Sequence, residues 1–351
     1  MTTSTILLQC LLVIAFVSVS SALSIPDPLK DVPSFVNPWH PFKNLSGCHM
    51  GENRTGIANM KKYLSEFGYL PSPLSNSNFS DSFDSEFQDA ILSYQRHLGL
   101  NTTGYLDEKT IEKMVSPRCG VADIINGTYT HGRNLYTYFE GNPAWPNTSR
   151  DLRYALIATS ASTIDVATLR QVFASAFSQW AAVIPMNFTE TDSAQDADIT
   201  IGFYSGSHGD GEPFDGPLGT LAHAFSPTDG RFHLDASETW VATDVTKSSS
   251  DEAIDLESVA VHEIGHLLGL GHSTIEEAIM YPTLTVRQRK VELTQDDVSG
   301  VQNLYGSNPG FKGVAPAGVA GEMDSSGSAE IIRGGLGVLL GLGILVMTVI
   351  L

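Results

Sequence analysis

The stretch Val261–Ser273 reads VHEIGHLLGLGHS, and it constrains this chain more than any other part of the sequence. His262 and His266 lie four residues apart, so a helix would place both imidazoles on one face, one turn apart. Gly269 can adopt the left-handed conformation that ends a helix, which would let His272 return to the same point. Three imidazoles with an open fourth position are typical of a catalytic zinc site rather than of a closed structural one.

The full spacing of this motif, HExxHxxGxxH, is much more specific than HExxH alone, for which a helix with solvated or core-packed histidines is the alternative. Bound zinc would lower the pKa of a water molecule to about 7 and polarise a substrate carbonyl. Glu263 would accept the proton of that water and deliver it to the leaving amine. Asp251 and Glu252 are expected near the positive end of the same helix. The motif predicts a zinc-dependent hydrolase with Glu263 as its catalytic base.

Composition sets the outer limits of the prediction. With 351 residues, of which 42% are hydrophobic, the chain is long enough to bury the cores of two modest domains. Its net charge of −19 argues against a nucleic-acid partner, because phosphate binding requires a basic surface. Part of this acidity is expected to bind cations.

The first residues predict a secretory signal peptide at 1–22. Residues 6–19 form an apolar run that is short for a membrane span, and small residues suited to a signal-peptidase site follow it. Asn-x-Ser/Thr sequons recur along the chain, which suits a lumenal or extracellular protein. The predicted glycosylation sites are Asn44, Asn53, Asn78, Asn101, Asn126, Asn147 and Asn187.

The C-terminal end has the pattern of a glycosylphosphatidylinositol (GPI) attachment signal. Residues 336–351 are uncharged and apolar up to the last residue, and small residues precede them at a short distance. The pattern predicts that a tail at 329–351 is replaced by the lipid, with a flexible stalk at 307–328, and that the protein lies on the outer face of the plasma membrane. The alternative is a tail that remains as a membrane anchor, for which it is short. The candidate attachment residues are Ser325, Ser326, Gly327 and Ser328.

Residues 45–116 predict a small unit of three short amphipathic helices. Apolar residues recur at helical spacing over 57–67 and 83–98, and a third, shorter helix follows Asp107. These apolar stripes are predicted to share one core, and nothing in them indicates chemistry. The three-helix pattern also resembles wall-polysaccharide-binding modules, so glycan binding is the competing interpretation of this segment.

Only two cysteines would remain in a secreted chain, because Cys10 leaves with the signal peptide. Cys48 and Cys119 could form a disulfide in an oxidising compartment. Alternatively Cys119, within the segment PRCGVAD at 117–123, could be a thiolate ligand of a metal bound elsewhere in the chain. The local sequence leaves both interpretations open.

The middle of the chain predicts the beginning of an α/β domain. Strands are expected at 152–158, 186–189 and 198–204, together with a helix that Asp165 caps. The following stretch, 208–238, concentrates histidines and carboxylates. Three histidines and an aspartate could form a closed zinc site, and the carboxylates could bind calcium, whereas a polar surface loop is the alternative.

Three motifs together make the chain resemble the matrix metalloproteinases, or matrixins, of the metzincin clan: His262–His272, Pro117–Asp123 and Ala278–Pro282. The resemblance covers about residues 45–306 and points to the short, GPI-anchored plant-type members. It implies an α/β (α+β) zincin-like metzincin catalytic domain, with a mixed, mostly parallel twisted sheet and three helices, after a small three-helix propeptide domain. The expected organisation is a signal peptide at 1–22, a propeptide at 23–126, the catalytic domain at 127–306, a stalk at 307–328 and a removed tail at 329–351.

The resemblance also implies that the protein is made as a latent precursor. In this family the cysteine of the PRCGxxD segment occupies the fourth position of the catalytic zinc, so Cys119 is the expected switch. Arg118 and Asp123 would form the salt bridge that holds the inhibitory loop. An activating protease would cut between Ala122 and Tyr129.

The same likeness assigns the stretch rich in histidines and carboxylates to further metal sites. The residues that match structural zinc ligands are His208, Asp210, His223 and His233. The residues that match a calcium site are the carboxylates Asp215, Asp235 and Glu238 and the carbonyls of Gly216, Leu218 and Thr220. Asp198 matches a carboxylate of a second calcium site, although the loop at 227–232 is shorter here than in many relatives.

An edge strand beside the zinc is predicted, and such a strand can bind an extended peptide as an added strand. The resemblance places Leu221 and Ala222 on this substrate-binding edge and Pro282 in the wall of the side-chain pocket. Met280 would form the methionine turn beneath the histidines. Relatives often carry an aromatic residue at the position of Leu284, so the resemblance does not fix which side chain the pocket prefers.

The predicted function is that of a secreted, cell-surface, zinc-dependent endopeptidase that is made as a zymogen and hydrolyses extracellular proteins or peptides. The expected cofactors are catalytic and structural zinc and calcium. The expected partners are the substrates, an activating protease and, through the lipid anchor, the membrane; the enzyme is expected to be a monomer without a nucleic-acid partner. The alternative is a catalytically inactive zinc-binding or cell-wall-binding surface protein.

Overall fold

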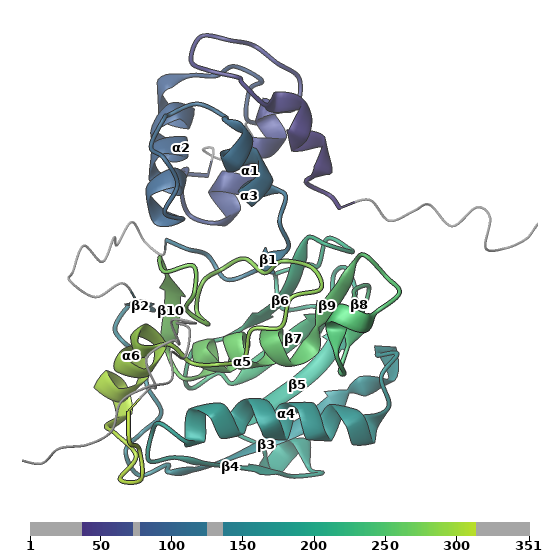
Figure 1. Ribbon diagram of the computed structural model, residues 1–351, viewed down its shortest axis with the longest axis vertical. Coiled ribbons are helices and arrows are strands. Elements are labelled where there is room, and N and C mark those ends of the chain that lie inside the picture. The colour runs from purple at the N-terminus through teal and green to yellow at the C-terminus, as the bar shows by residue number, and fades with distance from the viewer. Residues whose placement is uncertain (1–36, 73–77, 125–135, 314–351) are drawn as a thin grey trace, which may run out of the picture. The chain divides into compact units, whose positions relative to one another are not determined.

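The computed structural model describes residues 37–72, 78–124 and 136–313 (Figure 1). The predicted signal peptide, the candidate GPI-attachment residues, the C-terminal tail and Asn126 lie outside the described residues. So does most of the interval in which activation cleavage is expected. Within the described residues, no helix is both long enough and apolar enough to cross a membrane.

Three helices and a short 3-10 helix form the N-terminal unit. Asp84 and Asp107 cap the second and third helices with side chains that accept the backbone N–H of Phe87 and Thr110. The apolar faces meet in one buried cluster, to which Tyr281 from the distant C-terminal part of the chain also belongs. The elements are η1 (His40–Leu45), α1 (Ile57–Glu66), α2 (Ser85–His97) and α3 (Glu108–Met114).

A mixed six-stranded sheet, in the order β1-β6-β7-β5-β3-β4, frames the rest of the chain. All neighbouring strands are parallel except β6 and β7. The prediction of a mixed, mostly parallel sheet is therefore confirmed. The strands are β1 (Arg118–Cys119), β3 (Asp151–Ala158), β4 (Asn187–Glu190), β5 (Ile199–Tyr204), β6 (Thr220–Ala224) and β7 (Arg231–Asp235).

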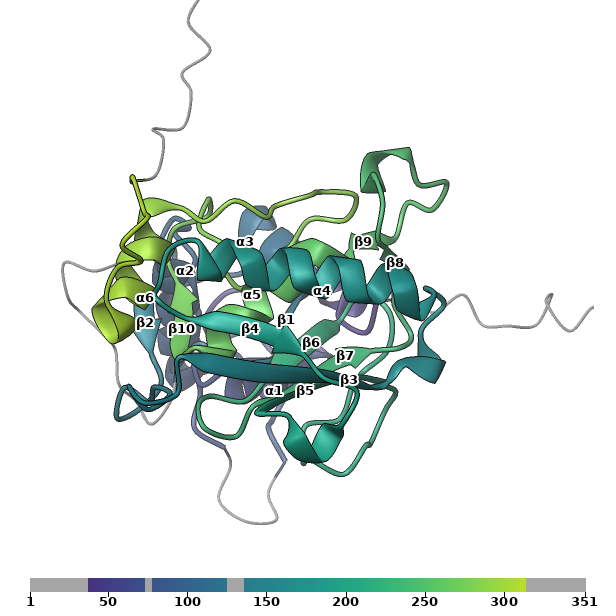
Figure 2. The ribbon, with the colours of Figure 1, turned by 90° about the horizontal axis from the view of Figure 1, so that it is seen from below.

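Two long helices, α4 (Val166–Ala181) and α5 (Leu256–Leu267), pack against each other and cover one face of the sheet (Figure 2). The ring of Phe177 in α4 stacks on that of Tyr154 in β3, with the ring centroids 4.4 Å apart. Aromatic burial of this kind fixes the helix on the sheet. As a result α5, which carries the histidine motif, has a rigid support beneath it.

The third helix of this part, α6 (Gln295–Tyr305), packs beside a separate antiparallel pair of strands, β2 (Tyr136–Tyr138) and β10 (Leu270–Ser273). With α4, α5 and α6 the three helices expected beside the sheet are present, and the predicted fold class is confirmed. Three short 3-10 helices complete the connections: η2 (Thr159–Ala161), η3 (Ala194–Asp196) and η4 (Val245–Lys247).

The beginning of α5 differs from the expectation. Residues 253–255 form strand β9 (Ala253–Asp255), which pairs in parallel with β8 (Thr239–Val241). The expected placement of Asp251 and Glu252 at the positive end of the helix is therefore wrong. Asp255 caps the helix instead, because its side chain accepts the backbone N–H of Ser258 at 2.8 Å.

Candidate active site and metal centres

His262 and His266 lie one turn apart on α5, and β10 brings His272 to the same point. The chain turns between these elements at Gly269, whose φ is +97°. A Cβ atom there would lie 2.2 Å from the carbonyl oxygen of Pro143, so the turn requires glycine. Burial lowers the pKa of all three imidazoles, which keeps the rings neutral and able to bind a metal.

The hydrogen bonds of the rings determine which nitrogens carry protons. His262 Nδ1 lies 2.7 Å from the carbonyl oxygen of Ile279, and His266 Nδ1 lies 2.7 Å from that of Leu270. Because a carbonyl only accepts, Nδ1 carries the hydrogen and Nε2 presents a lone pair. The Nε2 atoms are 3.1 Å apart between His262 and His266, and 3.2 Å apart between His266 and His272. Zinc bonds of about 2.0–2.1 Å place tetrahedral ligands roughly 3.3 Å apart, so the nitrogens fit a zinc ion.

Cys119 supplies a fourth donor, and we call Cys119, His262, His266 and His272 the helix cluster. The Sγ atom of Cys119 lies 3.3 Å from His266 Nε2. Both described cysteines, Cys48 and Cys119, are free, so the disulfide considered from the sequence is absent. Burial and the neighbouring Glu263 carboxylate raise the pKa of the Cys119 thiol well above its usual value. A positive ion held by the three imidazoles would favour the thiolate.

A buried ion pair connects the cysteine segment to the third histidine. Arg118 Nη2 lies 2.6 Å from Asp123 Oδ1, and neither side chain is exposed. The same oxygen lies 2.7 Å from His272 Nδ1, so the carboxylate orients this ring as well. Burial opposes ionisation, but the Arg118 guanidinium and His272 hold the pKa of Asp123 far below its usual range. Sequence reasoning placed Arg118 beside Asp123 and missed the contact with His272.

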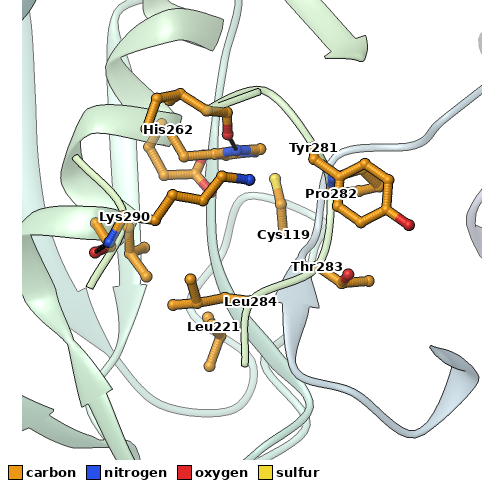
Figure 3. A pocket seen from close by; sticks show the side chains of 12 residues that line it. Cys119, Leu221, His262, Tyr281, Pro282, Thr283, Leu284 and Lys290 are labelled. Atoms are coloured by element: carbon orange, nitrogen blue, oxygen red, sulfur yellow. Dashed lines mark hydrogen bonds between the residues drawn. The ribbon is translucent and has the colours of Figure 1, made fainter. Parts of the chain in front are cut away.

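The cysteine segment lies in the cleft as an extended strand. On one side, the Gly120 N–H donates to the carbonyl oxygen of Ala222 in the edge strand β6 at 2.8 Å. On the other side, the Cys119 N–H donates to the carbonyl oxygen of Pro282 at 2.9 Å. The Cys119 side chain points into a pocket that Leu221 and Pro282 line (Figure 3). The two walls therefore bind extended backbone, which is how a cleft of this kind would bind a peptide.

Glu263 is completely buried beside the helix cluster. Burial raises its pKa to about 8, and the Cys119 thiol is the neighbour that opposes this shift. A carboxyl group whose pKa is close to neutral suits a group that accepts and returns a proton. Among the described residues, the helix cluster itself contains no carboxylate, so Glu263 is a neighbour of the donors and not one of them.

Met280 lies under the histidine helix and is fully buried. A Cβ atom on Gly265 would be 2.2 Å from Met280 Sδ, so glycine permits the close contact. The carboxylate of Asp297 accepts the backbone N–H groups of Ile279 at 2.9 Å and Met280 at 3.0 Å and thereby fixes this turn. Sequence reasoning missed this role of Asp297; the capping box that begins at Thr294 was the available signal.

A second set of donors, the loop cluster, lies beside the β6–β7 pair. Asp210 Oδ2 lies 2.7 Å from His208 Nε2, 2.8 Å from His223 Nε2 and 2.7 Å from His233 Nδ1. His223 and His233 are direct partners across the two strands. Although burial opposes it, hydrogen bonds lower the pKa of Asp210, and burial lowers the pKa of His223 to about 4. An ionised Asp210 and a neutral His223 are the states that zinc requires of these two donors. The loop cluster consists of His208, Asp210, His223 and His233.

Three carboxylates, Asp215, Asp235 and Glu238, are near enough to repel one another, although no close group of three donor atoms among the described residues includes them. Burial is the main cause of raised pKa values of about 6 for Asp215 and about 9 for Glu238, and the mutual repulsion of the three adds to it. One oxygen each of Asp235 and Glu238 is buried without a hydrogen-bond partner among the described residues. The backbone N–H of Leu218 donates to Glu238, and that of Thr220 donates to Asp215. A bound cation would relieve both the repulsion and the unpaired oxygens, and an all-oxygen site fits calcium.

Asp198 is placed differently. Its side chain is exposed, and Oδ2 accepts the backbone N–H of Arg153 at 2.8 Å. Among the described residues, no close group of three donor side chains includes Asp198.

Six sequon asparagines lie among the described residues, and every one of them is exposed. Exposed asparagines are accessible to glycosylation, which stays a prediction. They are Asn44, Asn53, Asn78, Asn101, Asn147 and Asn187.

Comparison with known families agrees with the class that the fold and the two clusters define. Residues 144–306 match the family described as matrixin. Residues 53–114 match a family described as "Putative peptidoglycan binding domain". The matrixin match covers the sheet from β3 to β7, both α5 and β10, and the loop cluster. The protein is therefore a zinc metalloendopeptidase of the matrixin type, and the predicted class of enzyme is confirmed.

The chain belongs to the matrixin family, as a matrix metalloproteinase of the plant type. It is 47% identical over 343 residues to Metalloendoproteinase 2-MMP of Arabidopsis thaliana, an alignment that covers 90% of each chain. It is 52% identical over 278 residues to Metalloendoproteinase 1-MMP of the same plant, with 77% of this chain and 74% of the relative covered. It is 38% identical over 256 residues to the human Neutrophil collagenase, with 71% and 50% covered. Matrixins use catalytic and structural zinc and calcium, as predicted, and act on proteins.

Proposed function

We propose that the chain is the latent precursor of a secreted zinc endopeptidase that a GPI anchor holds at the outer face of the plasma membrane. The apolar N-terminal run, the exposed sequons and the apolar C-terminal end support this route. The enzyme acts as a monomer on extracellular proteins or peptides after a separate protease has removed the propeptide. The proposed parts are a signal peptide at 1–22, a propeptide at 23–126, a catalytic domain at 127–306, a stalk at 307–328 and a removed tail at 329–351.

The position of Cys119 is the observation that carries the proposed latency. Its sulfur completes the helix cluster at 3.3 Å from His266 Nε2, and its strand fills the cleft between β6 and Pro282. A peptide cannot bind along β6 while this strand is present. The ion pair of Arg118 and Asp123 keeps the strand in place, because it is buried and attached to His272.

Removal of the propeptide would free both the cleft and the fourth donor position. The catalytic zinc, when bound, supplies a Lewis acid that polarises the scissile carbonyl and activates water. The edge strand β6, with Leu221 and Ala222, and the facing segment at Pro282 orient the peptide backbone by hydrogen bonds. Glu263 accepts a proton from the attacking water and returns it to the leaving amine. In the uncut chain, where the Cys119 strand fills the cleft, burial raises the pKa of Glu263 to about 8.

The remaining donors have structural roles in this proposal. The loop cluster would hold the structural zinc and join the loop after β5 to the β6–β7 pair. The carboxylates of Asp215, Asp235 and Glu238 would hold calcium beside β6, and so keep the substrate-binding edge in position.

The test of latency is the substitution Cys119→Ala in the full-length precursor. The unmodified precursor should hydrolyse a fluorogenic peptide only after propeptide removal, whereas the variant should be active without added protease, because the fourth position is free. Cys48→Ala is the matched control: Cys48 is also a buried free cysteine, but it is not part of the helix cluster, so that variant should stay latent. A Cys119→Ala precursor that is silent before cleavage and fully active after it would overturn the proposed switch.

A second candidate function concerns the propeptide. The match of residues 53–114 to a peptidoglycan-binding family favours binding of a cell-wall polysaccharide. The apolar stripes of α1 and α2 are buried in the core of the unit, so they are unavailable to a glycan. Sedimentation of the full-length precursor and of the mature enzyme with insoluble cell-wall material separates the two functions. Binding of the precursor alone would favour this candidate, and equal recovery of both forms would exclude it.

A further inference from the structure

A pocket lies beside the helix cluster. His262 of α5 lines one side of it, and the segment Pro282–Leu284 lines the other (Figure 3). Glu263 also lines the pocket. Leu221 and Ile279 add to a mostly apolar lining. Under the proposed function, this pocket takes the side chain of the residue that follows the scissile bond, the P1′ residue.

Lys290 brings a charged group into this apolar pocket. Figure 3 shows its side chain extended across the pocket, with the ammonium end toward the side where Cys119 and Tyr281 lie. The backbone N–H of Lys290 donates to Ser258 Oγ at 2.7 Å. Ser258 lies on α5, four residues before His262, so the position of Lys290 is tied to the helix that carries the zinc ligands.

The ammonium group of Lys290 has two partners among the described residues, one carbonyl oxygen and the ring of Tyr281, whose centroid lies 5.6 Å from Nζ. It can donate three hydrogen bonds, and one of them goes to the backbone carbonyl oxygen of Glu276 at 2.7 Å. No described carboxylate forms an ion pair with it within 4.0 Å. Burial lowers the pKa of Lys290 to about 8, while the more distant charges of Asp297, Glu276 and Glu277 favour the charged form. At neutral pH the pocket therefore contains a half-buried cation that lacks an acceptor of matching charge.

We propose that Lys290 determines the specificity of this pocket, by selecting P1′ side chains that end in an oxygen acceptor, glutamine and glutamate. This inference deepens the proposed function and rests on it. The stem of either side chain packs against the apolar lining, and its terminal oxygen accepts a hydrogen bond from the Lys290 ammonium. A hydrogen bond to a charged donor is stronger than one between neutral groups.

The alternatives are disfavoured by the same group. A leucine side chain would displace water from the ammonium without supplying an acceptor, and a pocket with an unpaired polar group discriminates against such a ligand. A lysine or arginine side chain would place a second positive charge beside Lys290.

The experiment uses mature enzyme prepared from the full-length precursor and four fluorogenic peptides that differ only at P1′, with glutamine, glutamate, leucine or lysine. Two variants are compared with the unmodified enzyme. Lys290→Met keeps most of the length of the side chain and removes the charge, and it should lower the ratio of kcat/KM for glutamine over leucine by about tenfold. Lys290→Arg keeps the charge and should retain most of that ratio.

Hydrolysis of the leucine peptide shows that each variant is folded and active, so the ratio is not affected by a general loss of enzyme. A glutamine-to-leucine ratio that is the same in Lys290→Met as in the unmodified enzyme would overturn the role of Lys290. If Lys290→Met is inactive on every peptide, the result for Lys290→Arg decides whether the inference holds. A large fall in the glutamine-to-leucine ratio of Lys290→Arg would contradict the inference. Absence of hydrolysis by the unmodified enzyme with all four peptides would instead overturn the proposed function, and the inference with it.

Discussion

The helix cluster and the loop cluster use nearly the same donors but close their fourth position in different ways. Each brings three imidazoles together, and each adds one acidic side chain. In the loop cluster this side chain is Asp210, two residues from His208, and its Oδ2 atom contacts all three histidines. In the helix cluster it is Cys119, which lies 147 residues from His266.

Under the proposed function, this difference would separate a permanent site from a switch. Asp210 cannot leave without unfolding the loop that also carries His208. Under the proposed latency, Cys119 would leave when the chain is cut after it, because non-covalent contacts hold its strand, among them the hydrogen bonds of the cleft and the Arg118–Asp123 pair. A closed site contributes folding energy, whereas a site that can open is available for catalysis.

The first test of the comparison between the two clusters removes Glu263, the carboxylate beside the helix cluster that is not one of its donors. Glu263 lies beside its donors and is not one of them, whereas the loop cluster uses its carboxylate as a donor. In the mature enzyme, Glu263→Ala should lower kcat by about 10³-fold, because the general base is lost. The zinc content, measured by atomic absorption, should stay unchanged. A variant with turnover close to that of the unmodified enzyme would remove Glu263 from the proposed mechanism.

The second test breaks the loop cluster. Asp210→Ala removes the atom that contacts all three of its histidines, so the site should lose its metal and the domain about 3 kcal/mol of stability. For a domain of this size, that loss lowers the melting temperature by roughly 10 °C. The measurement is thermal unfolding of the mature enzyme, in which the lower melting temperature should be seen while the peptide specificity stays unchanged.

The matched control for this test is Asp192→Ala. Asp192 forms an ion pair with Arg170, but its side chain is 88% exposed, and exposed pairs contribute little to stability. The melting temperature of Asp192→Ala should therefore stay within about two degrees of that of the unmodified enzyme. Equal shifts for Asp192→Ala and Asp210→Ala would mean that the loop cluster has no special role in folding.

Local features of the sequence predicted the three histidines of the helix cluster, whereas its fourth donor, Cys119, was assigned by the likeness to matrixins. The spacing of His262 and His266 matches one helical turn, and Gly269 marks where the helix ends, so these positions could be derived without any long-range contact. The residues of the loop cluster were assigned by their likeness to matrixins. The mixed sheet and its three helices followed from the same likeness and from alternating apolar residues.

Contacts between distant segments could not be predicted in this way. The bond between Asp123 and His272 joins residues 149 positions apart, and that between Tyr281 and Leu98 joins residues 183 positions apart. Neither contact leaves a periodic or spacing signal in the sequence, because each arises only when the N-terminal unit docks on the cleft. The charge of Lys290 in the pocket was missed for the same reason, since its partners lie on α5 and in the loop after β10.

The smallest expected effect concerns those docking contacts, which hold the propeptide independently of Cys119. Lys113 Nζ lies 2.9 Å from Glu276 Oε1, and the Tyr281 hydroxyl donates to the carbonyl oxygen of Leu98 at 3.1 Å. In the Cys119→Ala precursor these contacts should still slow the opening of the cleft. Adding Lys113→Met should therefore raise the activity of the uncut precursor roughly two- to fivefold, since the pair is partly exposed and is worth about 0.5–1 kcal/mol.

Lys109→Met in the same background is the matched control, because Lys109 lies on the same helix and forms no ion pair with a described carboxylate. Its activity before cleavage should equal that of Cys119→Ala alone. If Lys113→Met has no more effect than Lys109→Met, the cysteine and the buried Arg118–Asp123 pair account for the whole of the latency. In that case the contrast between the two clusters becomes sharper, because a single removable segment would then distinguish the site that opens from the site that stays closed.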